Sequence, residues 1–224
     1  MQFEEFLQKN NITLPESLFS LCQKGLGLME KSIDPLHKGD HIFRILDSLN
    51  SLLKYNPHIK EIIDFEVLLP AICWHDVWRS KKFFTSKSAF LYATFFDGLG
   101  SARFFKKTAK KLPIDKKLIK QITYTIRKHS AVQLLPYNTP TARILKELDL
   151  LDEWSQERLA TIEKAFLIPR KLSPRTIKVA KFYFDHYMTR AHQALFCLPW
   201  VKEEFESRKK PYIWQVQKLT EQYT

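Results

Sequence analysis

Apolar residues recur every three or four positions along most of the chain, and this spacing constrains the fold more than any other feature. Ile42, Ile45 and Leu49 fall on one face of a helix, and the stripe continues through Leu52 and Leu53. Alternating strand patterns bounded by turn signals are absent, and only 5 glycines leave little room for tight hairpins. The sequence therefore predicts an all-α fold.

Capping residues suggest where these helices begin. The first long helix is expected to start near residue 34, after Asp34-Pro35, or near residue 40, after Gly39-Asp40. An apolar run at 67–74 contains Pro70, so a second helix is expected to start or kink there. Other helices are expected after Asp115, after the turn-like 138–140, after Ser173-Pro174 with a span including 178–195, and at 15–30, 86–98, 101–111, 155–165, 198–208 and 212–222.

Composition limits the class of protein. Hydrophobic residues make up 45% of 224 residues, which excludes general disorder, and the chain is long enough for the core of one large domain or, as the alternative, of two small ones. The three cysteines are odd in number and far apart, which fits a reduced cytoplasmic setting better than a disulfide framework. No apolar stretch approaches the roughly 20 residues that span a bilayer, and the acidic, polar start is unlike a signal peptide.

The net charge of +12 favours anionic partners, either phosphorylated metabolites, nucleic acid or anionic lipid surfaces. The lysines are spread along the chain, so an ordinary solvated basic surface is an equal alternative.

Metal-capable side chains border the apolar segments. His75 and Asp76 end the apolar run at 67–74, where burial without a partner would cost several kcal/mol. His41 lies at the edge of the first stripe, four residues before Ile45, and Asp149 is flanked by leucines in RILKELDLLDEW. Each residue alone has a structural explanation, such as a hydrogen-bonded core histidine or a helix cap. Together, two imidazoles and two carboxylates suit one divalent ion, namely Mn, Fe, Co, Ni, Zn or Mg.

The order His … His-Asp … Asp resembles the HD-domain superfamily of metal-dependent phosphohydrolases, and so do the segments DHIFRIL, LLPAICWHDVW, IRKHS and TARILKELDLLDEW. The resemblance covers residues 34–155. It implies a single helical domain in which 1–33 pack on a metal-binding core at 34–155, and 156–224 form a C-terminal helical extension. The metal ligands it implies are His41, His75, Asp76 and Asp149.

The resemblance further implies hydrolysis of a phosphate ester, most plausibly in a nucleotide or related phosphorylated small molecule, by metal-bound hydroxide. Asp76 and Arg44 are the expected catalytic groups. The residues expected to touch substrate or support the site are His37, His129, Arg79, Lys82 and Lys87, although a solvated loop explains each of the cations individually. Asp152 is expected to be structural.

Two other readings remain open at this stage. The first is an HD-fold binding or regulatory module that is weak or inactive in catalysis. The second is a nucleic-acid-binding helical protein, for which 103–111 and 206–212 are the best basic segments, although no recognition motif is evident. The C-terminal helices are expected to close one side of the pocket or to form a homodimer face, and His186 and His192 are expected on a helix surface.

Overall fold

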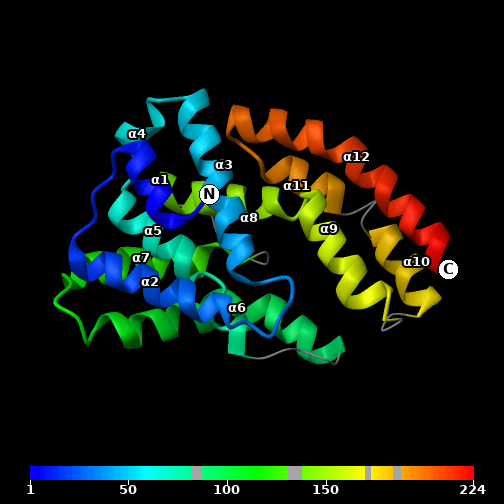
Figure 1. Cartoon of the computed structure of the whole chain (residues 1–224), viewed down its shortest axis with the longest axis horizontal. Helices are drawn as coiled ribbons and strands as arrows, with labels where there is room; N and C mark the ends of the chain where they lie inside the picture. Colours follow the sequence, from blue (N-terminus) through cyan, green and yellow to red (C-terminus); the bar gives the residue numbers. More distant parts are fainter. Residues whose placement is uncertain (82–86, 131–137, 170–172, 184–187) are drawn as a thin grey trace. The chain divides into compact units, whose positions relative to one another are not determined.

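The computed structural model describes residues 1–81, 87–130, 138–169, 173–183 and 188–224, and the side chains of all of these except 81, 87–95 and 183 (Figure 1). Regular structure in these residues is helical throughout, which confirms the all-α fold. No helix in this part of the chain combines the length and apolar character needed to cross a membrane.

The chain divides into two compact units, residues 1–146 and 147–224, and the division falls within helix α8. The first unit contains α1 (Phe3–Asn10), α2 (Glu16–Glu30), α3 (Gly39–Tyr55), α4 (Ile59–Ile62), α5 (Phe65–Trp74), the 3₁₀ turn Arg79–Lys81, α6 (Lys87–Ala109), α7 (Lys116–Lys128) and the start of α8 (Pro140–Asp152). The second contains the end of α8, α9 (Gln156–Ile162) with the π-helical segment Glu163–Leu167, α10 (Pro174–Tyr183), α11 (Thr189–Leu195) and α12 (Pro199–Tyr223). That 156–224 extend the same domain as 34–155 stays a prediction.

Helix α5 is the centre of the first unit, where it packs against α2, α3, α6 and α7. Every residue from 67 to 74 is buried, as expected for a helix that is apolar on all sides. At Gly25 of α2, an added Cβ would lie 2.6 Å from the Cys73 carbonyl oxygen, so only glycine permits this approach. Close by, the Trp74 indole Nε1 donates to the Leu21 carbonyl oxygen at 2.7 Å. The last turn of α5 is thus fixed against α2.

The prediction that α5 starts or kinks at Pro70 is wrong about the start. The helix begins at Phe65, after Asp64, whose carboxylate accepts a hydrogen bond from the Val67 amide at 3.2 Å. Pro70 is therefore an interior residue, and it is itself buried. Burial of the apolar neighbours offsets the one backbone hydrogen bond that proline cannot make.

Several other boundaries were predicted well. Helices α2, α7 and α8 match the expectations, and the Asp115 carboxylate caps α7 by accepting from the Lys117 and Leu118 amides. The first long helix begins at Gly39, the later of the two expected starts.

Two pairs of predicted short helices are single helices in the structure. The helices predicted at 86–98 and 101–111 are replaced by the single helix α6 (Lys87–Ala109), which passes through Gly98 and Gly100. Residues 198–208 and 212–222 belong to α12, which passes through Pro211. The buried face of α12, formed by Val201, Phe205, Tyr212 and Leu219, holds it as one helix across the proline.

Candidate metal centre

The two central residues of the candidate site follow directly on the fixed end of α5. His75 is the C-terminal cap of that helix and is fully buried. Its Nδ1 lies 2.7 Å from the Ile72 carbonyl oxygen, which has no proton to give, so Nδ1 donates. In a neutral ring, Nε2 then carries a lone pair that can accept a hydrogen bond or bind a metal.

His41 projects from α3 toward the same point. Its side chain is 1% exposed, and its Nε2 lies 3.0 Å from His75 Nε2. The Asp76 Oδ2 atom lies 3.3 Å from His75 Nε2 and 3.6 Å from His41 Nε2. Three donor atoms of the kinds that bind divalent ions thus converge from side chains that are at most 3% exposed.

Two further histidines flank the Asp76 carboxylate. His129, just past the end of α7, places Nε2 3.3 Å from Asp76 Oδ1, and its Nδ1 donates to the Ile126 carbonyl oxygen at 2.5 Å. His37 places Nε2 3.6 Å from Asp76 Oδ2, while its Nδ1 lies 2.7 Å from Asp34 Oδ2. Both expected histidines therefore lie next to the Asp76 carboxylate, and His37 is buried there.

The histidines determine the charge state of this carboxylate. Burial alone would raise the pKa of Asp76, but the charges of His75 and His37 and hydrogen bonds with His129 and His41 hold it well below its usual value. Asp76 is accordingly ionised at neutral pH. For His37 the balance is reversed, because burial lowers its pKa despite the nearby carboxylate of Asp76. The site therefore combines a buried anion at Asp76 with an imidazole at His37 that burial shifts toward its neutral form.

A buried ion pair lies beside the site. Arg79 Nε and Nη2 donate to Asp97 Oδ2 at 3.0 and 2.7 Å, and the Gly98 amide donates to Asp97 Oδ1 at 2.6 Å. The alternative of Arg79 as a cation of a solvated loop is wrong, because it is 8% exposed and held by Asp97. That Arg79 touches substrate or supports the site stays a prediction.

Asp97 also belongs to a second group of potential ligands with Asp76 and His129, whose donor atoms lie within 4.8 Å of one another. Both Asp97 oxygens already accept short hydrogen bonds, Oδ2 from the Arg79 guanidinium and Oδ1 from the Gly98 amide. A second cation at Asp97 would therefore have to displace Arg79. This favours a single ion at His41, His75 and Asp76.

The remaining predicted residues are less closely defined. Asp149 lies on α8, two residues after the second unit begins, and its side chain is half-buried. That Asp149 coordinates a metal ion stays a prediction. Arg44 lies on α3, three residues after His41, and is half-buried. Lys82 lies outside the described residues, and the side chain of Lys87 is likewise not described.

Sequence reasoning missed two roles in this site. Asp34 was expected as a helix cap, but its carboxylate accepts from His37 and from the Leu36 amide. Its position three residues before His37 was the available signal. Asp97 had no comparable signal, because it is 18 residues from its partner Arg79.

Comparison with known proteins adds no identity: neither models of protein families, nor curated proteins, nor solved structures give a match. The chemistry of the site therefore rests on its own geometry and on the ordered motifs of the sequence.

Proposed function

We infer that this protein is a metal-dependent phosphohydrolase of the HD type, acting on a phosphate ester of a nucleotide or related small molecule. One observation carries the inference. His41 Nε2, from α3, lies within 4.8 Å of His75 Nε2 and of a carboxylate oxygen of Asp76, both from the end of α5, and all three side chains are buried. Burial of such groups is costly unless they are satisfied, and a divalent cation satisfies all three together.

The donor set fits the proposed ion. Two imidazole nitrogens and a carboxylate suit a borderline first-row metal or Mg²⁺, and Asp149 is proposed as the fourth ligand. The Ile72 carbonyl fixes which nitrogen of His75 faces the site, as outer hydrogen bonds commonly do in metal centres. When bound, such an ion lowers the pKa of a coordinated water and polarises a phosphoryl oxygen.

The surrounding residues have distinct roles in this proposal. His129 holds Asp76 Oδ1 from the side away from His41, so the carboxylate keeps one orientation. Arg79 is a positioning residue, since Asp97 keeps its guanidinium near the buried carboxylates. Arg44 is the proposed phosphate-binding cation because it lies one turn from His41 and carries a planar fork of donors.

The test is a screen of the purified full chain against nucleotides and simple phosphate esters with Mn²⁺ or Co²⁺. We expect turnover by the wild type and its loss in His75→Ala. The matched control is His58→Ala, because the His58 side chain is 86% exposed. Equal, negligible turnover by wild type and both variants across the panel would refute the enzymatic proposal.

A further inference from the structure

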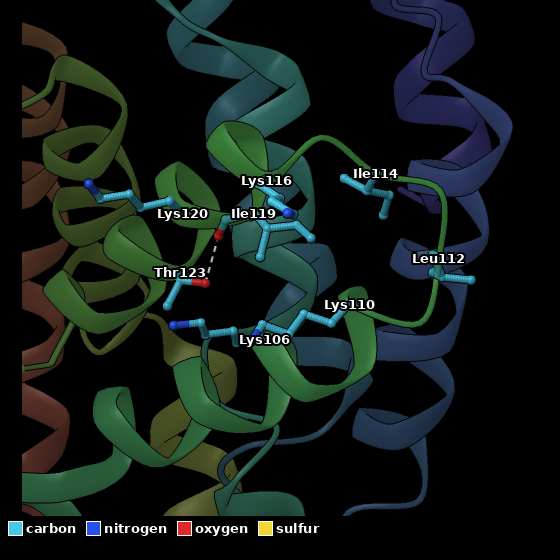
Figure 2. Close-up of a pocket in the computed structure, with 8 residues that line it drawn as sticks. All are labelled: Lys106, Lys110, Leu112, Ile114, Lys116, Ile119, Lys120 and Thr123. Carbon is cyan, nitrogen blue, oxygen red and sulfur yellow. Dashed lines mark hydrogen bonds between the residues drawn. The ribbon is translucent and has the colours of Figure 1, made fainter.

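A basic groove lies between the end of α6 and the start of α7 and encloses about 730 Å³. In Figure 2, Lys106 and Lys110 extend from α6 on one side, and Lys116 and Lys120 project from α7 on the other. Each pair is spaced by four residues, so its members lie on successive turns, about 6 Å apart along the axis. Both walls of the groove thus carry a pair of ammonium groups.

The charge around this groove is not neutralised locally. Residues 103–120 contain eight Lys and Arg and one acid, a net charge of +7 out of +12 for the chain. The one acid, Asp115, is occupied as the cap of α7. Within the described residues, no ion pair is found between the four groove lysines and a carboxylate. A polyanion is the ligand that this surface attracts most strongly.

The apolar part of the groove is recessed. Ile119 is buried, and Leu112 and Ile114 of the connecting loop are half-buried at the closed end (Figure 2). Membrane-binding surfaces present protruding apolar side chains to the lipid, whereas these are withdrawn below a rim of lysines. The groove therefore suits a ligand that inserts a flat or apolar part and leaves its anions at the rim.

The adjacent face of α6 bears a second pocket, of about 340 Å³, lined by aromatic and cationic side chains. Trp78 and Phe96 line it together with Arg103 and Lys107, and Phe96 is 43% exposed. The Trp78 ring lies directly over Gly100, where an added Cβ would be 2.5 Å from its Cγ. Aromatic rings beside cations are the combination that stacks bases and holds the phosphates between them.

We propose that the lysine groove, continued by the aromatic pocket, binds single-stranded nucleic acid. Phosphates lie along the lysine pairs, and bases occupy the apolar floor and the aromatic pocket. Cations on two neighbouring faces of α6 exceed what one nucleotide needs, which favours a strand over a mononucleotide. A duplex would leave its bases stacked inside and gain nothing from Trp78 and Phe96.

The proposal is tested by fluorescence anisotropy of a labelled 20-nucleotide oligo-dT with the full chain at several salt concentrations. The test variant replaces Lys106, Lys110, Lys116 and Lys120 by glutamine. The matched control replaces four lysines outside the groove, Lys9, Lys24, Lys54 and Lys202, which are also exposed. The two variants change net charge equally, so only the location of the charge differs.

We expect the groove variant to bind on the order of a hundredfold more weakly while the control binds within about threefold of wild type. The slope of log K against log salt should become shallower by about 3 in the groove variant, at about 0.7 per lost phosphate contact. Phe96→Ser should weaken binding about tenfold, through lost stacking, without changing the slope.

Three results would overturn the proposal. Equal losses in the two lysine variants would indicate general charge attraction. Tighter binding to a duplex than to a single strand of the same length would show that the bases do not stack in the aromatic pocket. Displacement of the labelled oligo-dT by polyglutamate, or by anionic vesicles, at the same total negative charge would indicate an acidic protein or a lipid partner instead. Every groove lysine is exposed, so we expect the groove variant to keep its fold. Circular dichroism of each variant checks that its helical content is unchanged.

Discussion

Both units of the molecule bury a histidine among helices, but the partners of the two rings differ. In the second unit, His192 Nδ1 accepts a hydrogen bond from the Trp154 indole at 3.0 Å, and its Nε2 lies 3.8 Å from Glu153 Oε2. One side of this ring faces a donor and the other a carboxylate. In the first unit, His41 and His75 present Nε2 to each other at 3.0 Å beside Asp76.

The difference shows how a structural histidine is distinguished from a candidate ligand. A ring whose nitrogens face a donor and an acceptor is satisfied by the protein itself. Three electron-pair donors that converge on one point need a shared proton or a cation between them. Burial does not separate the two cases, because His192 is 5% and His41 1% exposed.

The largest expected effect compares two buried aspartates. Asp76→Asn should lower kcat/KM for the phosphate ester identified in the screen about 10³-fold, because several kcal/mol of charge stabilisation depend on the ion it helps to hold. Asp152→Asn should leave kcat/KM within about threefold of wild type, since Asp152 contacts Arg158 at 3.5 Å within the second unit. Steady-state kinetics with saturating Mn²⁺ measures both. Equal losses of kcat/KM in the two variants would contradict a special role of Asp76 in catalysis.

A smaller effect is expected at His129, which contacts Asp76 Oδ1 without being a proposed ligand. His129→Ala should weaken metal affinity about 10- to 100-fold, as removal of outer-shell partners typically does. Isothermal titration of chelator-treated protein with Zn²⁺ or Mn²⁺ provides the affinity. An unchanged affinity would show that His129 does not orient the carboxylate.

In the second unit, we expect replacement of the buried histidine to lower the stability of the fold and to leave metal binding unchanged. His192→Ala removes the acceptor of a buried indole N–H and leaves a cavity, at a cost of about 2–3 kcal/mol in the free energy of unfolding. Its metal content should equal that of wild type. Urea denaturation measures the cost, and His192→Gln, which keeps an acceptor, should lose less. A loss of bound metal in His192→Ala would contradict the assignment of this ring as structural.

Acid should destabilise the chelator-treated protein in two steps. Burial lowers the folded-state pKa of His37 below its unfolded value of about 6.5, so stability declines as the pH falls from about 6.5 through that lower value. Although burial opposes it, the histidines hold the pKa of Asp76 below the ordinary value, so its contribution is complete above about pH 4 and is lost below. Urea unfolding between pH 8 and pH 3 measures both steps. His37→Gln should remove only the upper step, and an unchanged profile would refute this origin.

Much of the fold could be predicted because its signals are local. Asp115 and Pro140 mark the starts of α7 and α8, and apolar spacing identifies their buried faces. Helix α12 was divided in the prediction because Pro211 is a local breaker, whereas its continuity depends on burial of Phe205, Tyr212 and Leu219. A tertiary contribution of that kind cannot be read from a window of residues.

The site shows the same limit. The convergence of His41 with His75 and Asp76 was predicted from ordered motifs, and the structure places these side chains together. The ion pair between Arg79 and Asp97 was not predictable, because Asp97 reaches Arg79 only through the tertiary packing of α6. His192 was wrongly expected on a surface, because it is 5% exposed and its ring accepts a hydrogen bond from the distant Trp154 indole.

The measurement that tests the central claim most directly is the metal content of protein purified without chelator and then dialysed. Inductively coupled plasma mass spectrometry should find one divalent ion per chain in wild type and in His58→Ala. It should find essentially none in His75→Ala or Asp76→Asn. A wild type that takes up no Mn²⁺, Fe²⁺, Co²⁺, Ni²⁺, Zn²⁺ or Mg²⁺, even when each is supplied in excess, would contradict the account.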